Sequence, residues 1–375
     1  MDQRFAGQLS SLRGIRLVVG VLLFDVRRYL TSLRSEPSGW LRVRNRAERL
    51  EPAPDGSGYR CLWQWTSDLH APKHVPALGR WLMRRALDDH PIVLADAPQA
   101  TSSAPPQISF LIGHRGMARL PHLLMTLRSI AAQWGVAVEC IVIEQDVVSQ
   151  LRPHLPAWVR LVHTPPPAPD MPYCRAWTFN IGAQHARADV LVLHDNDMPV
   201  PADYAAWILA RTAQGYEVLN PKRFVFYLSE AHTQAVFAGG ADWLDAPPDA
   251  IVQNLEGGGS VAITRAAYEA IGGLDESFIG WGGEDNEFWE RAQTRRVWPW
   301  AGLPLVHLWH AAQPGKRDAT YHTAQHYQAL ARIDPRERIA RLRAIAQGRT
   351  HGPAGWEGAI KKDSETSPVG AGVGR

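Results

Sequence analysis

Between residues 108 and 193 the sequence alternates short apolar runs with longer segments of helical periodicity, and this alternation restricts the fold more than any other feature. Short apolar runs bounded by turn residues are typical of buried strands, whereas apolar residues three and four positions apart indicate one face of a helix. Strands that alternate with helices predict an α/β protein with a mostly parallel central sheet. The expected strands cover 108–112, 138–143, 160–163 and 188–193, and the expected helices cover 120–133 and 175–186.

Composition divides the 375 residues into four parts. Residues 1–95 contain no recognisable motif, and we interpret them as a small accessory N-terminal region with a helix over 80–87. Residues 96–107 are rich in Pro, Ser and Ala and predict a linker. Residues 108–347 form the α/β domain, with further helices expected over 201–214, 265–271, 287–295 and 320–347. Residues 348–375 are rich in Gly, Pro, Ser and Thr, and we expect a disordered tail.

Charge and cysteine content exclude several classes of protein. The formal net charge of +3 is too small to indicate a nucleic acid partner. The three cysteines, Cys61, Cys140 and Cys174, are widely spaced and form no CxxC pair. This distribution suits a reducing compartment and argues against a disulfide scaffold.

An apolar run at residues 17–24 is far shorter than the roughly 20 residues needed to cross a bilayer. It also lacks the cleavage signature of a signal peptide. Two interpretations remain for the run and the arginines around it: a basic amphipathic segment that contacts a membrane surface, or an element of a small domain with an exposed basic face. Those arginines are Arg13, Arg16, Arg27, Arg28 and Arg34.

Two acids follow the expected strand 188–193 directly. Asp195 and Asp197 flank Asn196 in a turn at the carboxyl end of that strand. Ligands of parallel sheets bind beyond this edge, and carboxylates in such a turn can converge on Mg²⁺ or Mn²⁺. Asp and Asn are also common in ordinary β-turns, so this motif alone is a weak signal.

A pair of histidines follows another apolar stretch. His307 and His310 are three positions apart, which places them on the same side of a helix or tight turn. Imidazole together with carboxylate makes a ligand set that suits Mn²⁺. The spacing therefore favours a metal site, although a single histidine would more often be an ordinary core or surface residue.

A glycine-rich loop at residues 280–283 contains Trp281 and leads directly into Glu284 and Asp285. Glycines permit close approach of another molecule, and a tryptophan among them is well placed to lie flat on a sugar. The acids are expected near a helix N-terminus, where negative charge is favoured. A carboxylate there can take a proton from a hydroxyl group.

These features combine into one chemistry. A metal held by carboxylate and imidazole can bind a diphosphate, and Arg115 at a strand end adds positive charge for a phosphate or a base. With a sugar platform at Trp281 and a base at Asp285, the residues suit transfer of a sugar from a nucleoside diphosphate to an alcohol. A metal-dependent phosphatase or nucleotidyltransferase would need a phosphate-binding loop, and residues 113–116 are too short for one.

Seven motifs follow one another along the chain. They are Ile112-Gly-His-Arg115, Cys174-Arg-Ala-Trp-Thr-Phe-Asn-Ile-Gly182, Leu193-His-Asp-Asn-Asp-Met198, Gly257-Gly-Gly-Ser260, Gly272-Gly273, Gly280-Trp-Gly-Gly-Glu-Asp285 and His307-x-x-His310. In this order of motifs the chain resembles the GT-A glycosyltransferases, and within them the β-1,4-galactosyltransferase C-terminal group and its bacterial family-2 relatives, over about residues 108–328. The resemblance implies the GT-A fold, with the mostly parallel sheet flanked by helices.

The resemblance also implies residue roles. Asp285 would be the catalytic base, and Glu284 would hold the acceptor. Trp281 would stack on the donor and acceptor sugars. The remaining substrate-binding positions would be Arg115 and Arg175 at the nucleotide, Asp195 near the ribose and the metal, and Gly258, Gly283 and Leu255. The metal, Mn²⁺ or Mg²⁺, would be bound by Asp197, His310 and His307, with Asp195 beside it.

Two departures from the family pattern bear on these expectations. The usual third acid after the glycines is Asn286 here, and galactose-specific animal members carry a tyrosine where Leu255 aligns. Loss of that phenol would enlarge the pocket near the C2 substituent of the sugar, so both UDP-Gal and UDP-GalNAc are expected donors.

The resulting hypothesis is an inverting, metal-dependent hexosyltransferase that uses a UDP-sugar and a saccharide or lipid-linked saccharide acceptor. A catalytically weak protein that binds sugar nucleotides on the same fold is the alternative. The absence of the membrane anchor of animal members suggests a bacterial, cytoplasmic enzyme of surface-glycan synthesis, peripheral to the inner face of the membrane.

Overall fold

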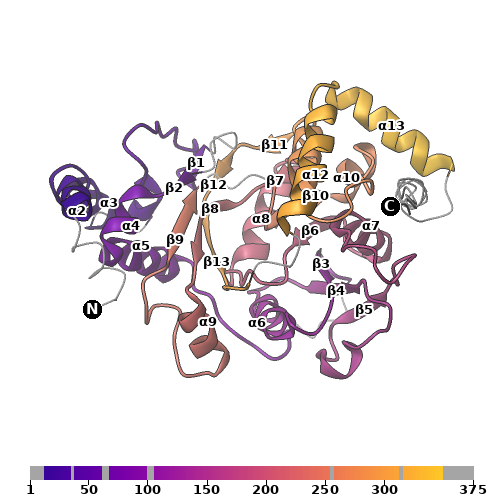
Figure 1. The fold of residues 1–375 in the computed structure, drawn as a ribbon, viewed down its shortest axis with the longest axis horizontal. Coiled ribbons are helices and arrows are strands. Elements are labelled where there is room, and N and C mark those ends of the chain that lie inside the picture. Colours follow the sequence, from indigo (N-terminus) through magenta and orange to yellow (C-terminus); the bar gives the residue numbers. More distant parts are fainter. Residues whose placement is uncertain are drawn as a thin grey trace, which may run out of the picture.

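The computed structural model describes residues 12–34, 38–60, 67–98, 105–253, 257–311 and 316–348. The expected tail over 348–375 lies outside these ranges except for Gly348, which ends a helix, and residues 99–104 of the expected linker also lie outside them. Helices surround a central group of strands and occupy both ends of the long axis (Figure 1). None of the described helices combines the length and the apolar character that a membrane span requires.

The central sheet has seven strands in the order β11-β7-β10-β6-β3-β4-β5. Strands β6, β3, β4 and β5 are mutually parallel, whereas β10 runs antiparallel to β6 and β7. The expected α/β class with a mostly parallel sheet is thus confirmed. The strands are β3 (Ile108–His114), β4 (Val138–Glu144), β5 (Arg160–His163), β6 (Val190–His194), β7 (Val218–Leu219), β10 (Ser260–Thr264) and β11 (Val297–Trp298).

Helices connect and cover these strands because parallel neighbours need crossover connections. The apolar face predicted for residues 120–133 is buried, with Leu123, Leu127 and Ile130 fully inaccessible. The helices of this part are α6 (Leu120–Ala131), α7 (Arg175–His185), α8 (Tyr204–Thr212), α9 (Glu230–Phe237), α10 (Arg265–Ala270), α11 (Glu284–Ala292), α12 (Lys316–Leu330) and α13 (Pro335–Gly348), with a 3₁₀ turn η3 (Arg152–His154).

Two helix predictions need correction. The helix expected over 287–295 begins at Glu284, because Gly283 adopts a left-handed conformation (φ 88°) and turns the chain into the helix earlier. The single helix expected over 320–347 is two helices, α12 and α13. Asp334 precedes Pro335, and a residue before proline is disfavoured in helical conformation, so the chain breaks there and restarts with proline in the first turn.

The N-terminal helices pack on a second sheet of order β13-β8-β9-β2. One buried hydrophobic cluster includes Leu82 from the helices and Phe224 and Val306 from the sheet. Buried Arg223 donates to the carbonyl groups of Leu41 and Val43 (3.0 and 2.8 Å). The elements are α2 (Leu12–Phe24), α3 (Val26–Arg34), η1 (Gly39–Arg42), α4 (His70–His74), α5 (Pro76–Asp89), β2 (Ser67–Asp68), β8 (Lys222–Tyr227), β9 (Ala250–Gln253) and β13 (Leu303–His307), and β1 (Tyr59–Arg60) pairs with β12 (Trp300–Ala301).

Candidate active site

A cavity of about 560 Å³ lies at the carboxyl ends of β3 and β6. This is the edge at which parallel sheets bind their ligands. Its walls come from segments far apart in the sequence, so only the folded chain assembles it. Of the residues predicted from the sequence, those that line it are Arg115, Arg175, Asp195, Asp197, Gly258, Trp281, Glu284, Asp285, His307 and His310.

One carboxylate and two imidazoles meet in this cavity. Asp197 lies in the turn after β6, His307 ends β13, and His310 follows three residues later. A hydrogen bond from the Leu308 amide to the Asp197 carbonyl (2.9 Å) joins the two segments. One ligand atom from each of the three side chains lies within 4.8 Å of the others. The three side chains can therefore converge on one metal ion.

The hydrogen bond that His310 makes through Nδ1 leaves Nε2 as the ring atom that could bind a metal. Nδ1 lies 2.9 Å from the carbonyl of Ala311, which can only accept, so Nδ1 carries the proton. The other ring nitrogen, Nε2, faces the Asp197 carboxylate at 3.3 Å. Burial lowers the pKa of His310, which favours the neutral ring that metals require. The ring of His307 stacks on Tyr227, with centroids 4.4 Å apart.

Neighbouring side chains help to keep Asp197 ionised although it is buried. Burial raises its pKa, but the larger combined effect of His307, His310 and Arg119 leaves the pKa below its ordinary value. Arg119, which precedes α6, donates from Nη1 to the Asp197 carboxylate at 2.8 Å. Sequence reasoning missed Arg119, whose one signal was a basic residue shortly after a strand end.

The first acid of the Asp195-Asn196-Asp197 turn has different partners. Arg175, the first residue of α7, donates to Asp195 from Nε and Nη2 (3.0 and 2.8 Å) and to Asp285 from Nη1. Asp195 therefore lies outside the three-residue ligand group and is linked through Arg175 to the predicted base. The Asn196 amide donates to Nδ1 of His114 (2.9 Å) at the end of β3.

Helix α11 begins with the two predicted catalytic acids. Glu284 is 6% exposed and accepts from the Gly282 amide at 2.9 Å. Burial, followed by the charge of Asp285, raises the pKa of Glu284 to about 7. Burial also raises the pKa of Asp285, and the ion pair with Arg175 opposes this shift. The site thus contains one carboxyl group that titrates near neutral pH beside another that an arginine helps to keep ionised.

The two glycines predicted to bind substrate lie in different surroundings. A Cβ at Gly258 would approach the Asp285 carboxylate to 3.0 Å, so a side chain there would disturb the predicted base. Gly283 does not line the cavity; a Cβ there would lie 2.9 Å from Cβ of Tyr327 and 3.1 Å from the Phe278 ring. Gly283 therefore allows the close packing of α11 against α12.

Two further predicted residues line the cavity: Trp281 has an exposed side chain, whereas the Arg115 side chain is held by a hydrogen bond. The Trp281 side chain is 46% exposed, and the Thr323 hydroxyl donates to its carbonyl (2.7 Å). Arg115 donates to the Met171 carbonyl (2.6 Å), so its guanidinium also holds the proline-rich loop that precedes α7. Leu255 lies outside the described residues.

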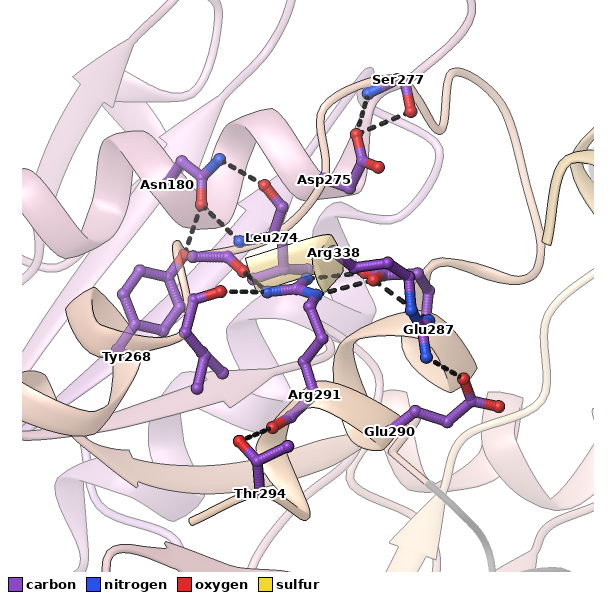
Figure 2. A network of polar contacts seen from close by, with 12 residues as sticks. Asn180, Tyr268, Leu274, Asp275, Ser277, Glu287, Glu290, Arg291, Thr294 and Arg338 are labelled. Atoms are coloured by element: carbon purple, nitrogen blue, oxygen red, sulfur yellow. Dashed lines mark hydrogen bonds and ion pairs between the residues drawn. The ribbon is translucent and has the colours of Figure 1, made fainter. Parts of the chain in front are cut away.

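A buried network of polar contacts joins α11 to neighbouring segments of the chain (Figure 2). Glu287 and Arg291, one helical turn apart, pair at 2.6 Å, and Arg291 also donates to two carbonyl groups in the segment after α10. Arg338 of α13 reaches Glu287 at 3.3 Å and Glu290 at 2.5 Å. The network joins three parts of the chain and sets the direction in which α11 presents its first turn.

Several other cavity-lining residues were not singled out from the sequence. They come from the ends of β3 and β8, from α7, and from the segments before α6, before α7, before β9 and after β13. An aromatic residue at a strand end was a usable signal for Tyr227, but its strand was not predicted. The missed residues are His114, Arg119, Tyr173, Phe179, Tyr227, Asp249 and Trp309.

Comparison with protein families gives one match, to a family described as "N-terminal domain of galactosyltransferase", over residues 253–298. This segment includes three of the motifs on which the resemblance depends, at residues 257–260, 272–273 and 280–285. The match confirms the predicted resemblance over that stretch. Comparison with curated protein sequences gives no match.

Solved structures similar to this chain include the catalytic domain of Drosophila β1,4-galactosyltransferase 7 in complex with xylobiose. That match has 19% identity and a TM-score of 0.30, and it covers 51% of this chain and 63% of the Drosophila chain. GalNAc-T7 with UDP, GalNAc and Mn²⁺ has 13% identity and a TM-score of 0.44, with 70% of this chain and 55% of that chain covered. The present chain thus spans less than two thirds of either structure.

Proposed function

We propose that this protein is an inverting, metal-dependent GT-A glycosyltransferase that moves a hexose, Gal or GalNAc, from a UDP-sugar to a hydroxyl of a saccharide acceptor. One observation supports this most strongly: a single cavity is lined by a metal-ligand group and by two acids next to an exposed tryptophan. The acids and the tryptophan lie within the segment that matches the galactosyltransferase family.

The proposed metal site fits Mn²⁺ or Mg²⁺. Its donors are an ionised carboxylate at Asp197 and two imidazoles at His307 and His310, a mixed set that suits Mn²⁺ better than the all-oxygen preference of Mg²⁺. Nδ1 of His307 is buried and has no hydrogen-bond partner among the described residues. A bound metal would supply positive charge that stabilises the diphosphate as it leaves.

Asp285 is proposed to act as the base. It accepts the proton of the acceptor hydroxyl while the acceptor oxygen bonds to the anomeric carbon. The bond from that carbon to the diphosphate oxygen breaks, its electron pair leaves with UDP, and the configuration inverts. The pairing of Arg175 with Asp285 favours the ionised form against the effect of burial. Glu284 orients the acceptor, and Trp281 offers a flat surface to the sugars.

The donor is proposed to be UDP-Gal or UDP-GalNAc, because the resemblance aligns Leu255 with a tyrosine of galactose-specific members and a leucine side chain is smaller than a tyrosine. The kcat/KM values of the two donors give the test. A preference for UDP-Gal above about 100-fold, roughly 2.7 kcal/mol, would contradict the dual donor use.

The setting belongs to the same proposal. The proposed reaction fits a saccharide or lipid-linked saccharide acceptor and a role in bacterial surface-glycan synthesis. The basic N-terminal region supports a cytoplasmic position with peripheral contact to the membrane. An acceptor screen with free and lipid-linked oligosaccharides would separate the two acceptor classes.

UDP release tests the proposed reaction. Wild type is incubated with Mn²⁺ and a panel of UDP-sugars, with and without acceptor sugars. We expect Asp285→Asn to lower kcat by about 10²- to 10⁴-fold with little change in donor binding, because it removes only the base. Asp197→Ala should weaken Mn²⁺ binding as well as turnover. Asp275→Asn, the same change in a turn outside the cavity, serves as the matched control.

Two outcomes would contradict the assignment. Full activity in both Asp197→Ala and Asp285→Asn would show that the cavity is not the active site. A wild-type protein that binds a UDP-sugar and Mn²⁺ but releases no UDP with any acceptor would support the alternative, a protein that binds sugar nucleotides without turnover.

A further inference from the structure

Helix α2 presents an apolar face to solvent. Ile15, Val19, Leu22 and Leu23 are 43%, 45%, 53% and 69% exposed, and Phe24 at the end of the helix is also exposed. The spacing of the first four residues places them along one side of an α-helix. Five of the eleven exposed large hydrophobic residues in the described part of the chain therefore lie on this one helix.

The opposite side of α2 fixes the helix to the protein. Val21 is fully buried in the cluster that the N-terminal helices share with the second sheet. Arg46 donates to the Gly20 carbonyl (3.3 Å), and its guanidinium lies 5.0 Å from the ring of Phe24. In Figure 1, α2 lies at one end of the long axis, on the outside of α3 and α4. The apolar face is thus held outward by a packed helix.

The surroundings of this face are strongly basic. Described residues 12–34 and 38–50 contain nine arginines and two carboxylates, although the whole chain has a net charge of only +3. One of the carboxylates, Asp25, is buried and paired with Arg46 and Arg28 (2.5 and 3.5 Å). Six arginines of these two ranges are exposed: Arg16 lies on α2 itself, Arg46 lies against the Phe24 ring, and the others are Arg27, Arg34, Arg42 and Arg49.

An apolar stripe bordered by arginines matches the two parts of an anionic bilayer surface. Apolar side chains enter the boundary between headgroups and acyl chains, and guanidinium groups bind the phosphates. At 13 residues, α2 is too short to span the bilayer, so it would lie in the plane of the surface. A protein partner would need acidic groups around an apolar groove, which is a more specific requirement than an anionic lipid surface.

We propose that α2 is a membrane-docking helix whose face of Ile15, Val19, Leu22, Leu23 and Phe24 inserts into an anionic lipid surface. This identifies the residues that make the peripheral membrane contact included in the proposed function. It requires neither the donor nor the metal, so a failure of the proposed reaction would leave it intact.

Vesicle co-sedimentation of the full chain tests this proposal. Wild type is expected to sediment with phosphatidylcholine vesicles that contain phosphatidylglycerol, to bind pure phosphatidylcholine much more weakly, and to dissociate partly at high salt. The double variant Leu22→Asp/Leu23→Asp should lose at least tenfold in partitioning. Ile345→Asp, an exposed apolar residue on α13, is the matched control and should bind like wild type.

Three results would overturn the proposal. Wild type could fail to bind anionic vesicles, or the double variant could bind them as well as wild type does. The third result is that, in sedimentation without lipid, wild type is a dimer and the double variant is a monomer. The last result would identify the face as a contact between copies. If the double variant does not fold, as judged by thermal unfolding, Arg16→Gln/Arg27→Gln replaces it, with the same requirement that anionic binding falls.

Discussion

Arg119 lies where a metal ion and the protein compete for the same carboxylate. Its guanidinium is 2.8 Å from Asp197, and His310 approaches the same carboxylate oxygen at 3.3 Å. A divalent cation bound by Asp197 would have to displace or tolerate this neighbouring positive charge. Arg119 therefore lowers the affinity of the proposed site while keeping Asp197 ionised.

We predict that Arg119→Gln tightens Mn²⁺ binding by roughly tenfold, about 1.4 kcal/mol, because it removes one positive charge from the site. Electron paramagnetic resonance of free Mn²⁺ during titration measures this without any substrate. Arg115→Gln, which removes a charge from the same cavity but not from Asp197, should leave the affinity nearly unchanged. Weaker Mn²⁺ binding by Arg119→Gln would contradict the prediction.

Glu284 gives the second prediction at the residue scale. Burial and Asp285 raise its pKa to about 7 from an ordinary value of 4.5. Between these values the folded protein holds a proton that the unfolded chain releases, so the stabilisation is present at low pH and falls as the pH rises through about 7. The slope is at most about 1.4 kcal/mol per pH unit.

Glu284→Gln removes this titration, so its thermal stability should fall less between pH 5 and pH 8 than that of wild type. Melting temperatures across the pH range give the comparison. The exposed Glu269→Gln should keep the slope of wild type. Identical slopes for wild type and Glu284→Gln would show that Glu284 does not hold a proton in the folded protein.

At the scale of elements, the direction of α11 depends on charges that are almost fully buried. Glu287 and Arg338 have side chains only 1% and 3% exposed, and they join α11 to α13 (Figure 2). Charges buried in this way are costly when one partner is lost. The C-terminal helix α13 is therefore part of the support of the candidate active site, although it contributes no residue to the cavity.

We expect Arg338→Met to reduce the free energy of unfolding by about 3 kcal/mol, because it leaves buried carboxylates with fewer partners. Arg341→Met, which breaks the pair with Glu337 on the exposed side of the same helix, should cost less than about 0.5 kcal/mol. Urea unfolding of both variants measures the difference. Equal losses would mean that the buried network does not stabilise the fold.

At the scale of the whole molecule, the N-terminal region shares its core with the second sheet. Strand β2 pairs with β9, and β1 pairs with β12, so N-terminal strands share sheets with strands that come about 180 to 240 residues later in the sequence. We propose that residues 1–95, although they carry none of the motifs, fold and unfold together with the α/β domain as one cooperative unit. The second sheet also supplies His307 and Tyr227 to the cavity.

Calorimetry of the full chain should therefore show one unfolding transition. Arg223→Met, which removes the buried hydrogen bonds to Leu41 and Val43, should lower the temperature of that whole transition by several degrees. Arg60→Met, which breaks an exposed ion pair with Glu51, should change it little. Two separate transitions would contradict a single unit.

The sequence by itself determined the α/β class, the strands of the parallel half of the sheet and the charged and aromatic residues singled out above for the cavity, because local periodicity and short motifs encode them. Leu123, Asp197, Trp281 and His310 were all assigned from neighbours in the chain. These properties depend on residues a few positions apart, and such spacings are visible without a structure.

Only the tertiary structure decided the contacts between distant residues. It showed that Asp195 pairs with Arg175 instead of joining the ligand group, that Arg119 shares Asp197 with the histidines, and that Gly283 packs under α12. It also showed that the apolar face of α2 is exposed. The sequence alone had left open whether this run contacts a membrane surface or belongs to a small domain with an exposed basic face. Burial and pairing across the chain depend on how elements pack, and packing has no local signature in the sequence.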